Sequence, residues 1–176
     1  MSYALRLARP SDEPFLWEML FEASHVEGSH AADDHGGVSG PDVLRDVPEL
    51  ARYVAGWGQL PTDIGFVGLE AADLRPIGAA WLRLLTGADA GYGYVDDATP
   101  ELAVAVVPSL RGTGLGGQLL QAVLGEAKVL FPAVCLSVRA DNPARRLYER
   151  LGFRLVPGGE MPKRAGGTSI TMVLRF

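Results

Sequence analysis

A glycine-rich segment carries the clearest chemical signal in this sequence. Residues 108–117 read Pro-Ser-Leu-Arg-Gly-Thr-Gly-Leu-Gly-Gly, between an apolar run typical of a strand and an apolar run typical of a helix. Glycine lets the chain adopt positive φ and approach a ligand closely, and the free N–H groups that open the helix attract an anion. The segment therefore predicts a pyrophosphate site; the alternative is a loop that only turns tightly.

Two binding patterns overlap in this loop. Gly112, Gly114 and Gly117 match the dinucleotide pattern G-x-G-x-x-G, whereas Arg111, Gly114 and Gly116 match R-x-x-G-x-G. A dinucleotide fold places its glycines after the first strand of a repeated βαβ array, and too few residues follow this loop to build the second half of such a sheet. A dinucleotide-binding oxidoreductase is therefore the weaker interpretation.

A second segment, residues 134–153, leads from a strand-like run through an asparagine into a short helix. Asn142 is placed to cap this helix and Pro143 to occupy its first position. Its apolar stripe has spacing i, i+3, i+4 and i+7 and consists of Ala144, Leu147, Tyr148 and Leu151. By spacing alone, Asn142 is only a cap and Tyr148 only a half-buried aromatic residue.

Together the two segments resemble the acyl-CoA signatures of the GNAT superfamily of N-acetyltransferases. One signature is R-x-x-G-x-G at residues 111–116, and the other is the asparagine-to-tyrosine segment before Gly152 and Phe153. The resemblance implies an α/β (α+β) GNAT fold, with a mixed, mostly antiparallel sheet flanked by helices. Two strands, ending near Val107 and Arg139, would splay apart and hold acetyl-CoA between them.

The resemblance also implies roles for individual residues. The loop amides would hold the pyrophosphate with help from Arg111, and the strand edge near Val106 would pair with pantetheine. Asn142 would contact the pantetheine arm, and Tyr148 would lie near the thioester sulfur. The cofactor-binding set is Val106, Val107, Arg111, Gly112, Thr113, Gly114, Leu115, Gly116, Gly117, Asn142 and Tyr148.

The reaction requires a base, because an amine attacks a thioester only as the neutral free base. Glu101 opens the strand before the loop and shares one face with two small alanines, at positions 103 and 105, so it is the leading candidate. The equally weighted alternative is that Glu101 is only a solvated residue at a strand end. Asp97 is a weaker candidate for the base. Tyr148 would protonate the departing thiolate, and an N–H near Val106 would stabilise the oxyanion.

The remaining periodicity predicts the elements that position these residues. An opening strand covers residues 3–8, and a helix follows whose start is marked by Ser11, Asp12 and Pro14. A helical stretch at 43–54 is interrupted by Pro48. Further strands are expected at residues 64–69, 77–85, 101–107, 134–139 and 168–176, with a helix of apolar stripe Leu115, Leu119, Val123 and Ala127 after the glycine loop.

Composition narrows the class of protein. With 176 residues and 48% hydrophobic content, the expectation is one acetyltransferase domain over 1–176. We find no apolar run long enough for a membrane span and no signal segment, which favours the cytoplasm. The net charge of −5 disfavours nucleic-acid binding.

Cys135, the sole cysteine, is expected to be a buried apolar residue, with a nucleophile as the minor alternative.

Three histidines, His25, His30 and His35, recur beside Asp33 and Asp34. This pattern suggests a transition-metal site, but it lacks evidence of a preorganised shell, so we expect an exposed polar loop and no metal.

The sequence leaves the acceptor open. Four aromatic residues are candidates for the wall of an acceptor site: Trp57, Trp81, Tyr92 and Tyr94. The favoured alternative is that each packs into the core or covers it. A primary amine on a small molecule or a peptide is the expected acceptor. A non-catalytic acyl-CoA-binding or sensing module is the alternative function, and monomer and homodimer both remain possible.

Overall fold

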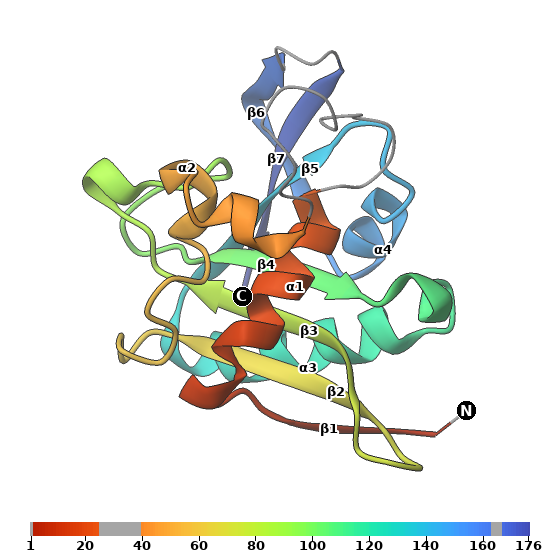
Figure 1. Cartoon of the computed structure of the whole chain (residues 1–176). Coiled ribbons are helices and arrows are strands. Elements are labelled where there is room, and N and C mark those ends of the chain that lie inside the picture. Colours follow the sequence, from red (N-terminus) through yellow and green to blue (C-terminus); the bar gives the residue numbers. More distant parts are fainter. Residues whose placement is uncertain (1, 25–39, 163–166) are drawn as a thin grey trace.

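The described residues form a seven-stranded sheet, with its strands in the order β1-β2-β3-β4-β5-β7-β6 (Figure 1). The computed structural model describes residues 2–24, 40–162 and 167–176. The strands are β1 (Tyr3–Leu7), β2 (Ile64–Glu70), β3 (Pro76–Arg83), β4 (Glu101–Val106), β5 (Ala133–Arg139), β6 (Arg154–Pro162) and β7 (Thr168–Arg175). The α-helices are α1 (Glu13–Ser24), α2 (Pro48–Ala51), α3 (Leu115–Leu130) and α4 (Arg145–Arg150).

The centre of the sheet holds the one parallel pair among the described strands. Neighbouring strands run antiparallel except β4 and β5, which are paired only at Glu101 and Cys135. Beyond that point the two strands diverge. This arrangement confirms the predicted mixed, mostly antiparallel sheet with a splayed strand pair, and it differs from the parallel, doubly wound sheet of a dinucleotide-binding fold.

Helices cover both faces of the sheet (Figure 1). The apolar stripe of α3 packs on one face, where the side chains of Leu115, Leu119 and Val123 are completely buried. The opposite face carries α1, whose Leu16 and Met19 pack in a cluster with Trp81 of β3. Both helices therefore follow from apolar residues at helical spacing. None of the helices in the described parts of the chain is long and apolar enough to cross a membrane.

Two predicted helices have different boundaries. The stretch at 43–54 consists of a 3-10 turn (Pro41–Leu44) and α2, and Pro48 begins α2 because proline has no N–H to donate and suits the first helical turn. In the second case, α4 begins at Arg145 with Ala144 as its N-cap, so the prediction that Asn142 caps this helix is wrong. The Asn142 side chain instead accepts a hydrogen bond from the Ala144 N–H (2.8 Å) in the preceding turn.

Strand β6 is absent from the elements that the sequence predicts. It lies at the edge of the sheet, most of its residues are exposed, and its pairing with β7 is irregular between Leu155 and Glu160. Pro157, Gly158 and Gly159 occupy that interval. An exposed edge strand interrupted by proline and glycine shows no apolar alternation, which is the signal that period-two analysis needs.

Candidate active site

A cavity opens where β4 and β5 separate. Its volume is ≈ 810 Å³, within the usual range for small-molecule sites. Its walls come from the end of α1, β4, the glycine loop, β5 and α4. Segments far apart in the chain therefore meet at one hollow in the middle of the sheet.

The structure brings most of the predicted site residues to this cavity. Its lining includes Glu101, Val106, Arg111, Gly112, Gly114, Gly116, Gly117, Asn142 and Tyr148. The side chain of Leu115 is instead buried in the core, and the Thr113 hydroxyl donates a hydrogen bond to the Leu110 carbonyl (2.7 Å). Val107 and Asp97 also lie outside the lining, and exposed Asp97 accepts a hydrogen bond from the Tyr94 hydroxyl (2.9 Å).

The glycine loop has the backbone geometry that its composition predicts. Gly112 and Gly114 have φ angles of 76° and 93°, which favour glycine, and no other atom lies within 4 Å of where their Cβ atoms would be. Gly114 is the N-cap of α3, a helix of 16 residues. The first amides of a helix have no intrahelical acceptor, so the positive end of α3 lies beside the cavity. This end of the cavity suits a phosphate group.

Arg111 supplies the neighbouring positive charge, and it has a partner. Its guanidinium forms an ion pair with Glu22 of α1 (2.7 Å), and both residues line the cavity. The pair joins the end of α1 to the glycine loop at the wall of the cavity. An anion bound in the loop would therefore share this guanidinium with the Glu22 carboxylate.

Beyond Glu101, the edge of β4 that faces β5 has no strand partner among the described residues. The Val107 N–H donates to the Ile77 carbonyl on β3 (3.0 Å), and Val106 is opposite Gly78. Because antiparallel partners alternate between bonded and non-bonded pairs, the N–H and C=O groups of Val104 and Val106 point away from β3, toward β5. With β4 and β5 paired only at Glu101, this edge can bind an extended ligand by strand-like hydrogen bonds.

Glu101 is a buried carboxyl group, so the alternative of a solvated strand end is wrong. Its side chain is 4% exposed, and its Oε1 accepts hydrogen bonds from the Tyr53 hydroxyl (2.7 Å) and the Gly93 N–H (2.9 Å). Its Oε2 has no partner among the described residues. Burial raises the pKa of Glu101 to about 7, although the two hydrogen bonds favour the carboxylate. A carboxyl group with this pKa can accept a proton near neutral pH.

This raised pKa also couples the stability of the fold to pH. Between the ordinary value of 4.5 and about 7, the folded state binds more protons than the unfolded state, so stability falls as pH rises through this interval. We expect the free energy of unfolding of Glu101→Gln, compared with that of the wild type, to increase by about 3 kcal/mol as pH rises from about 4 to about 8. Urea unfolding measures this difference. Glu126→Gln on the exposed face of α3 is the control, and an equal gain there would contradict the prediction.

Tyr148 of α4 brings a neutral phenol to the same cavity. Its side chain is 7% exposed, and its ring packs edge-on against Phe153 with centroids 5.9 Å apart. Burial raises the pKa of Tyr148 to about 12, so the hydroxyl keeps its proton at neutral pH. The site therefore combines a carboxyl group that can accept a proton with a phenol that can donate one.

Sequence reasoning did not connect Glu101 with Tyr53 or with the loop of Gly91, Tyr92 and Gly93, which contact Glu101 in the structure. The two glycines around Tyr92 are a weak signal for close packing, but nothing in the spacing connects Tyr53 with Glu101, 48 residues later.

The four aromatic residues considered for a substrate wall separate into two groups. Trp57 and Trp81 are buried in the core. Tyr92 and Tyr94 are more than 40% exposed, and only Tyr92 of these four residues lines the cavity. Cys135 is completely buried in β5, which confirms its expected burial, and burial raises the pKa of its thiol.

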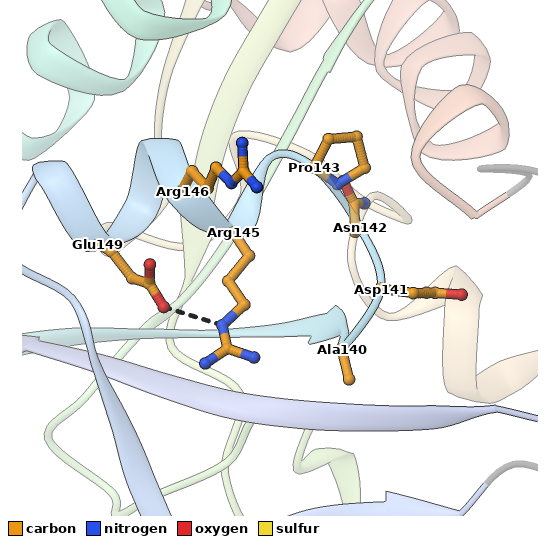
Figure 2. A pocket seen from close by; sticks show the side chains of 7 residues that line it. All are labelled: Ala140, Asp141, Asn142, Pro143, Arg145, Arg146 and Glu149. Atoms are coloured by element: carbon orange, nitrogen blue, oxygen red, sulfur yellow. Dashed lines mark hydrogen bonds and ion pairs between the residues drawn. The ribbon is translucent and has the colours of Figure 1, made fainter.

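A second, smaller pocket of ≈ 490 Å³ lies at the start of α4 (Figure 2). Asn142 and Pro143 line both this pocket and the larger cavity. Arg145 points toward Glu149 and forms an ion pair with it (2.9 Å), while Arg146 extends from the same helix (Figure 2).

The histidine cluster considered for a metal, His25, His30 and His35 with Asp33 and Asp34, lies outside the described residues. Within the residues that are described, no group of three or more His, Cys, Asp or Glu side chains is arranged to hold a metal ion.

Comparison with known proteins identifies the family. A family model described as an acetyltransferase (GNAT) domain matches residues 63–155, which is more than half of the chain. The chain therefore belongs to the GNAT family and is an acyltransferase. A comparison with curated protein sequences gives no significant match.

Solved structures share the fold over nearly the whole chain. The yncA protein from Salmonella typhimurium, solved with its cofactor acetyl-CoA, has a TM-score of 0.68 and 22% identity, covering 99% of this chain and 94% of its own. A phosphinothricin acetyltransferase from Sinorhizobium meliloti, in complex with acetyl-CoA, has a TM-score of 0.65 and 20% identity, with coverages of 100% and 89%. The ribosomal-protein-S18-alanine N-acetyltransferase from Escherichia coli has a TM-score of 0.62 and 20% identity, with coverages of 99% and 94%.

Proposed function

We propose that this chain is an N-acetyltransferase, one domain over 1–176, that transfers the acetyl group of acetyl-CoA to a primary amine. The observation that carries the proposal is the cavity between β4 and β5, where the glycine loop, the edge of β4 that faces β5, Glu101 and Tyr148 meet. Family membership gives the class of reaction. The acceptor and the roles of the individual residues are our inference.

The residues present fit acetyl-CoA. The open glycine loop at the start of α3 suits the pyrophosphate, and Arg111 adds charge beside it. The edge of β4 at Val104 and Val106, which has no strand partner among the described residues, suits the amide groups of pantetheine. Asn142 and Tyr148, which line the cavity from the α4 side, would contact the far part of the arm and the sulfur. Acetyl-CoA supplies the thioester, the electrophile of the reaction.

In the proposed chemistry, Glu101 acts before the amine attacks and Tyr148 acts when the thiolate departs. Glu101 accepts a proton from the acceptor ammonium, and the free amine attacks the acetyl carbonyl. The Val106 N–H stabilises the negative charge on the carbonyl oxygen. A C–N bond forms and the C–S bond breaks. Tyr148 then donates its proton to the departing thiolate. The acetylated nitrogen loses its second proton, which returns to the Tyr148 phenolate directly or through water, and the products are an N-acetylated amine and CoA.

The acceptors in the names of structurally similar proteins are diverse: phosphinothricin, spermidine and the alanine of a ribosomal protein. Each contains an amino group, which supports an amine acceptor for this chain. The choice between a small molecule and a peptide requires a screen.

A thermal-shift experiment followed by an amine screen tests this function. We expect acetyl-CoA and CoA to raise Tm, because a ligand that binds the native state stabilises it, and we expect no shift with NAD or NADP. Release of free thiol in the presence of amines then measures transfer. Stabilisation by acetyl-CoA without turnover on any small or peptide amine would favour the sensing module, and no stabilisation would contradict the proposal.

Tyr148→Phe tests the proposed acid. We expect kcat to fall by about 10²-fold, within the range for loss of general acid catalysis, because phenylalanine keeps the packing against Phe153 but has no proton to donate. Steady-state kinetics with saturating acetyl-CoA measure the change. Tyr94→Phe, which removes an exposed hydroxyl outside the cavity, is the matched control. Unchanged turnover in Tyr148→Phe would remove this residue from the mechanism.

A further inference from the structure

Tyr53 connects three segments of the chain through one hydroxyl group. Its side chain is 7% exposed and lies just after α2. The hydroxyl donates to Glu101 Oε1 (2.7 Å) and accepts from the Tyr92 N–H (2.9 Å). Both hydrogen-bonding directions of the phenol are therefore used, which determines the position of its proton.

The loop around Tyr92 fits closely over the same carboxyl group. A Cβ atom on Gly91 would collide with Glu101 Oε2 and lie 2.6 Å from the Tyr53 hydroxyl oxygen. A Cβ atom on Gly93 would lie 2.9 Å from Glu101 Oε1 and 2.7 Å from the Leu136 carbonyl carbon. Only glycine allows this approach, so the loop, Tyr53 and Glu101 form one packed unit.

The hydrogen bonds distinguish the two oxygens of Glu101. Oε1 accepts from two donors, Tyr53 and Gly93, whereas buried Oε2 has no partner among the described residues. An oxygen that already accepts two hydrogen bonds is a poor site for a further proton. The proton accepted by Glu101 therefore belongs on Oε2.

We propose that Tyr53 is a positioning residue that holds Glu101 Oε1 and reserves Oε2 as the proton-accepting atom. This inference rests on the proposed function of Glu101 as the base. Tyr53 does not exchange its own proton, because burial and the adjacent carboxyl group raise the pKa of its hydroxyl well above the usual range.

Among the described residues, three other ionisable residues lie around Glu101, and none of them has a side-chain hydrogen bond to its carboxyl group like that of Tyr53. From the α2 side, Arg52 favours the carboxylate and donates to the Ala90 carbonyl (2.6 Å), which ties down the loop. Cys135 faces Glu101 from β5, and burial raises the pKa of its thiol, which stays neutral. Tyr92 is on the loop itself, and burial also raises the pKa of its hydroxyl.

Tyr53→Phe tests the proposal by two measurements on the full chain. Because the Tyr53 hydrogen bond lowers the pKa of Glu101, its loss is expected to raise that pKa by about one pH unit. Carbon-13 NMR of labelled glutamate measures the titration of Glu101 directly. In the rate profile, kcat/KM is expected to fall about fivefold at pH 7 and to recover at about pH 9, with KM for acetyl-CoA unchanged.

The controls separate positioning from structure. Tyr94→Phe, the same chemical change at an exposed hydroxyl, is expected to leave both profiles unchanged. If Tyr53→Phe does not fold, 3-fluorotyrosine at position 53 applies the test in reverse: its more acidic phenol donates more strongly and is expected to lower the pKa of Glu101. A loss of activity that is equal at all pH values, with the Glu101 titration unmoved, would overturn the proposal.

Glu101→Gln separates failure of the proposed base, Glu101, from failure of the positioning role of Tyr53. Wild-type turnover in Glu101→Gln would overturn the proposed base and the positioning role with it. Loss of turnover in Glu101→Gln, together with an unmoved titration in Tyr53→Phe, would overturn the positioning role alone.

Discussion

Acetyl transfer is expected to slow by about 10²- to 10⁴-fold when Glu101 is replaced by glutamine, the range for loss of a general base. Glutamine keeps an oxygen that accepts the hydrogen bonds of Tyr53 and Gly93, so the local packing is retained. It cannot take a proton from an ammonium at neutral pH. Steady-state kinetics at saturating acetyl-CoA measure the loss.

The pH profile makes this prediction specific to the proposed base. In the wild type, kcat/KM is expected to rise with pH through an apparent pKa of about 7, the value for Glu101, because only the carboxylate accepts a proton. This limb is expected to disappear in Glu101→Gln, while the Tm increase with acetyl-CoA remains. Glu126→Gln, an exposed position on α3, is the matched control. An unchanged acidic limb in Glu101→Gln would assign the base to another group.

The second large effect is expected at the glycine loop. Gly116→Asp places a carboxylate in the first turn of α3, where the pyrophosphate is proposed to bind, and we expect KM for acetyl-CoA to rise by about 10- to 100-fold through charge repulsion and lost charge-assisted hydrogen bonds. The fold is expected to persist. The atom nearest to a Cβ on Gly116 is Val106 Cγ2 at 3.8 Å, and an acidic residue in the first turn stabilises a helix.

Two controls isolate the charge at this position. Gly125→Asp adds the same charge to the exposed side of the same helix, where no atom lies within 4 Å of the new Cβ, and is expected to leave KM near the wild-type value. Gly116→Ala adds a methyl group without charge and is expected to have a small effect. If Gly116→Asp and Gly125→Asp have equal KM values, the pyrophosphate does not bind at the start of α3.

The strand–glycine loop–helix unit was predictable because its determinants are local. The β-branched run before the loop, the glycines within it and the apolar stripe after it lie within about thirty consecutive residues, and each acts through its own backbone preference or periodicity. Hence β4, the positive φ angles at Gly112 and Gly114, and α3 agree with the expectation. The same holds for α1, whose apolar spacing specifies the face that it buries.

Elements with weak local signals were missed or misplaced. β6 is an exposed edge strand, so its residues show no alternation to detect. The start of α4 depends on whether the Asn142 side chain bonds within the turn or caps the helix, and both are compatible with the same residue types. Such competition between local hydrogen bonds is decided by the neighbouring structure.

Residue types and spacing were sufficient to indicate a GNAT fold and a strand–glycine loop–helix unit, and to make Glu101 and Tyr148 candidates for proton transfer. Whether Glu101 is solvated or buried was decided only by tertiary structure. Its environment comes from Tyr53, 48 residues earlier, and from a loop that packs over it. The Arg111–Glu22 pair likewise joins residues 89 positions apart. A pKa depends on desolvation and on the atoms in contact, and for Glu101 these atoms come from segments that only folding brings together.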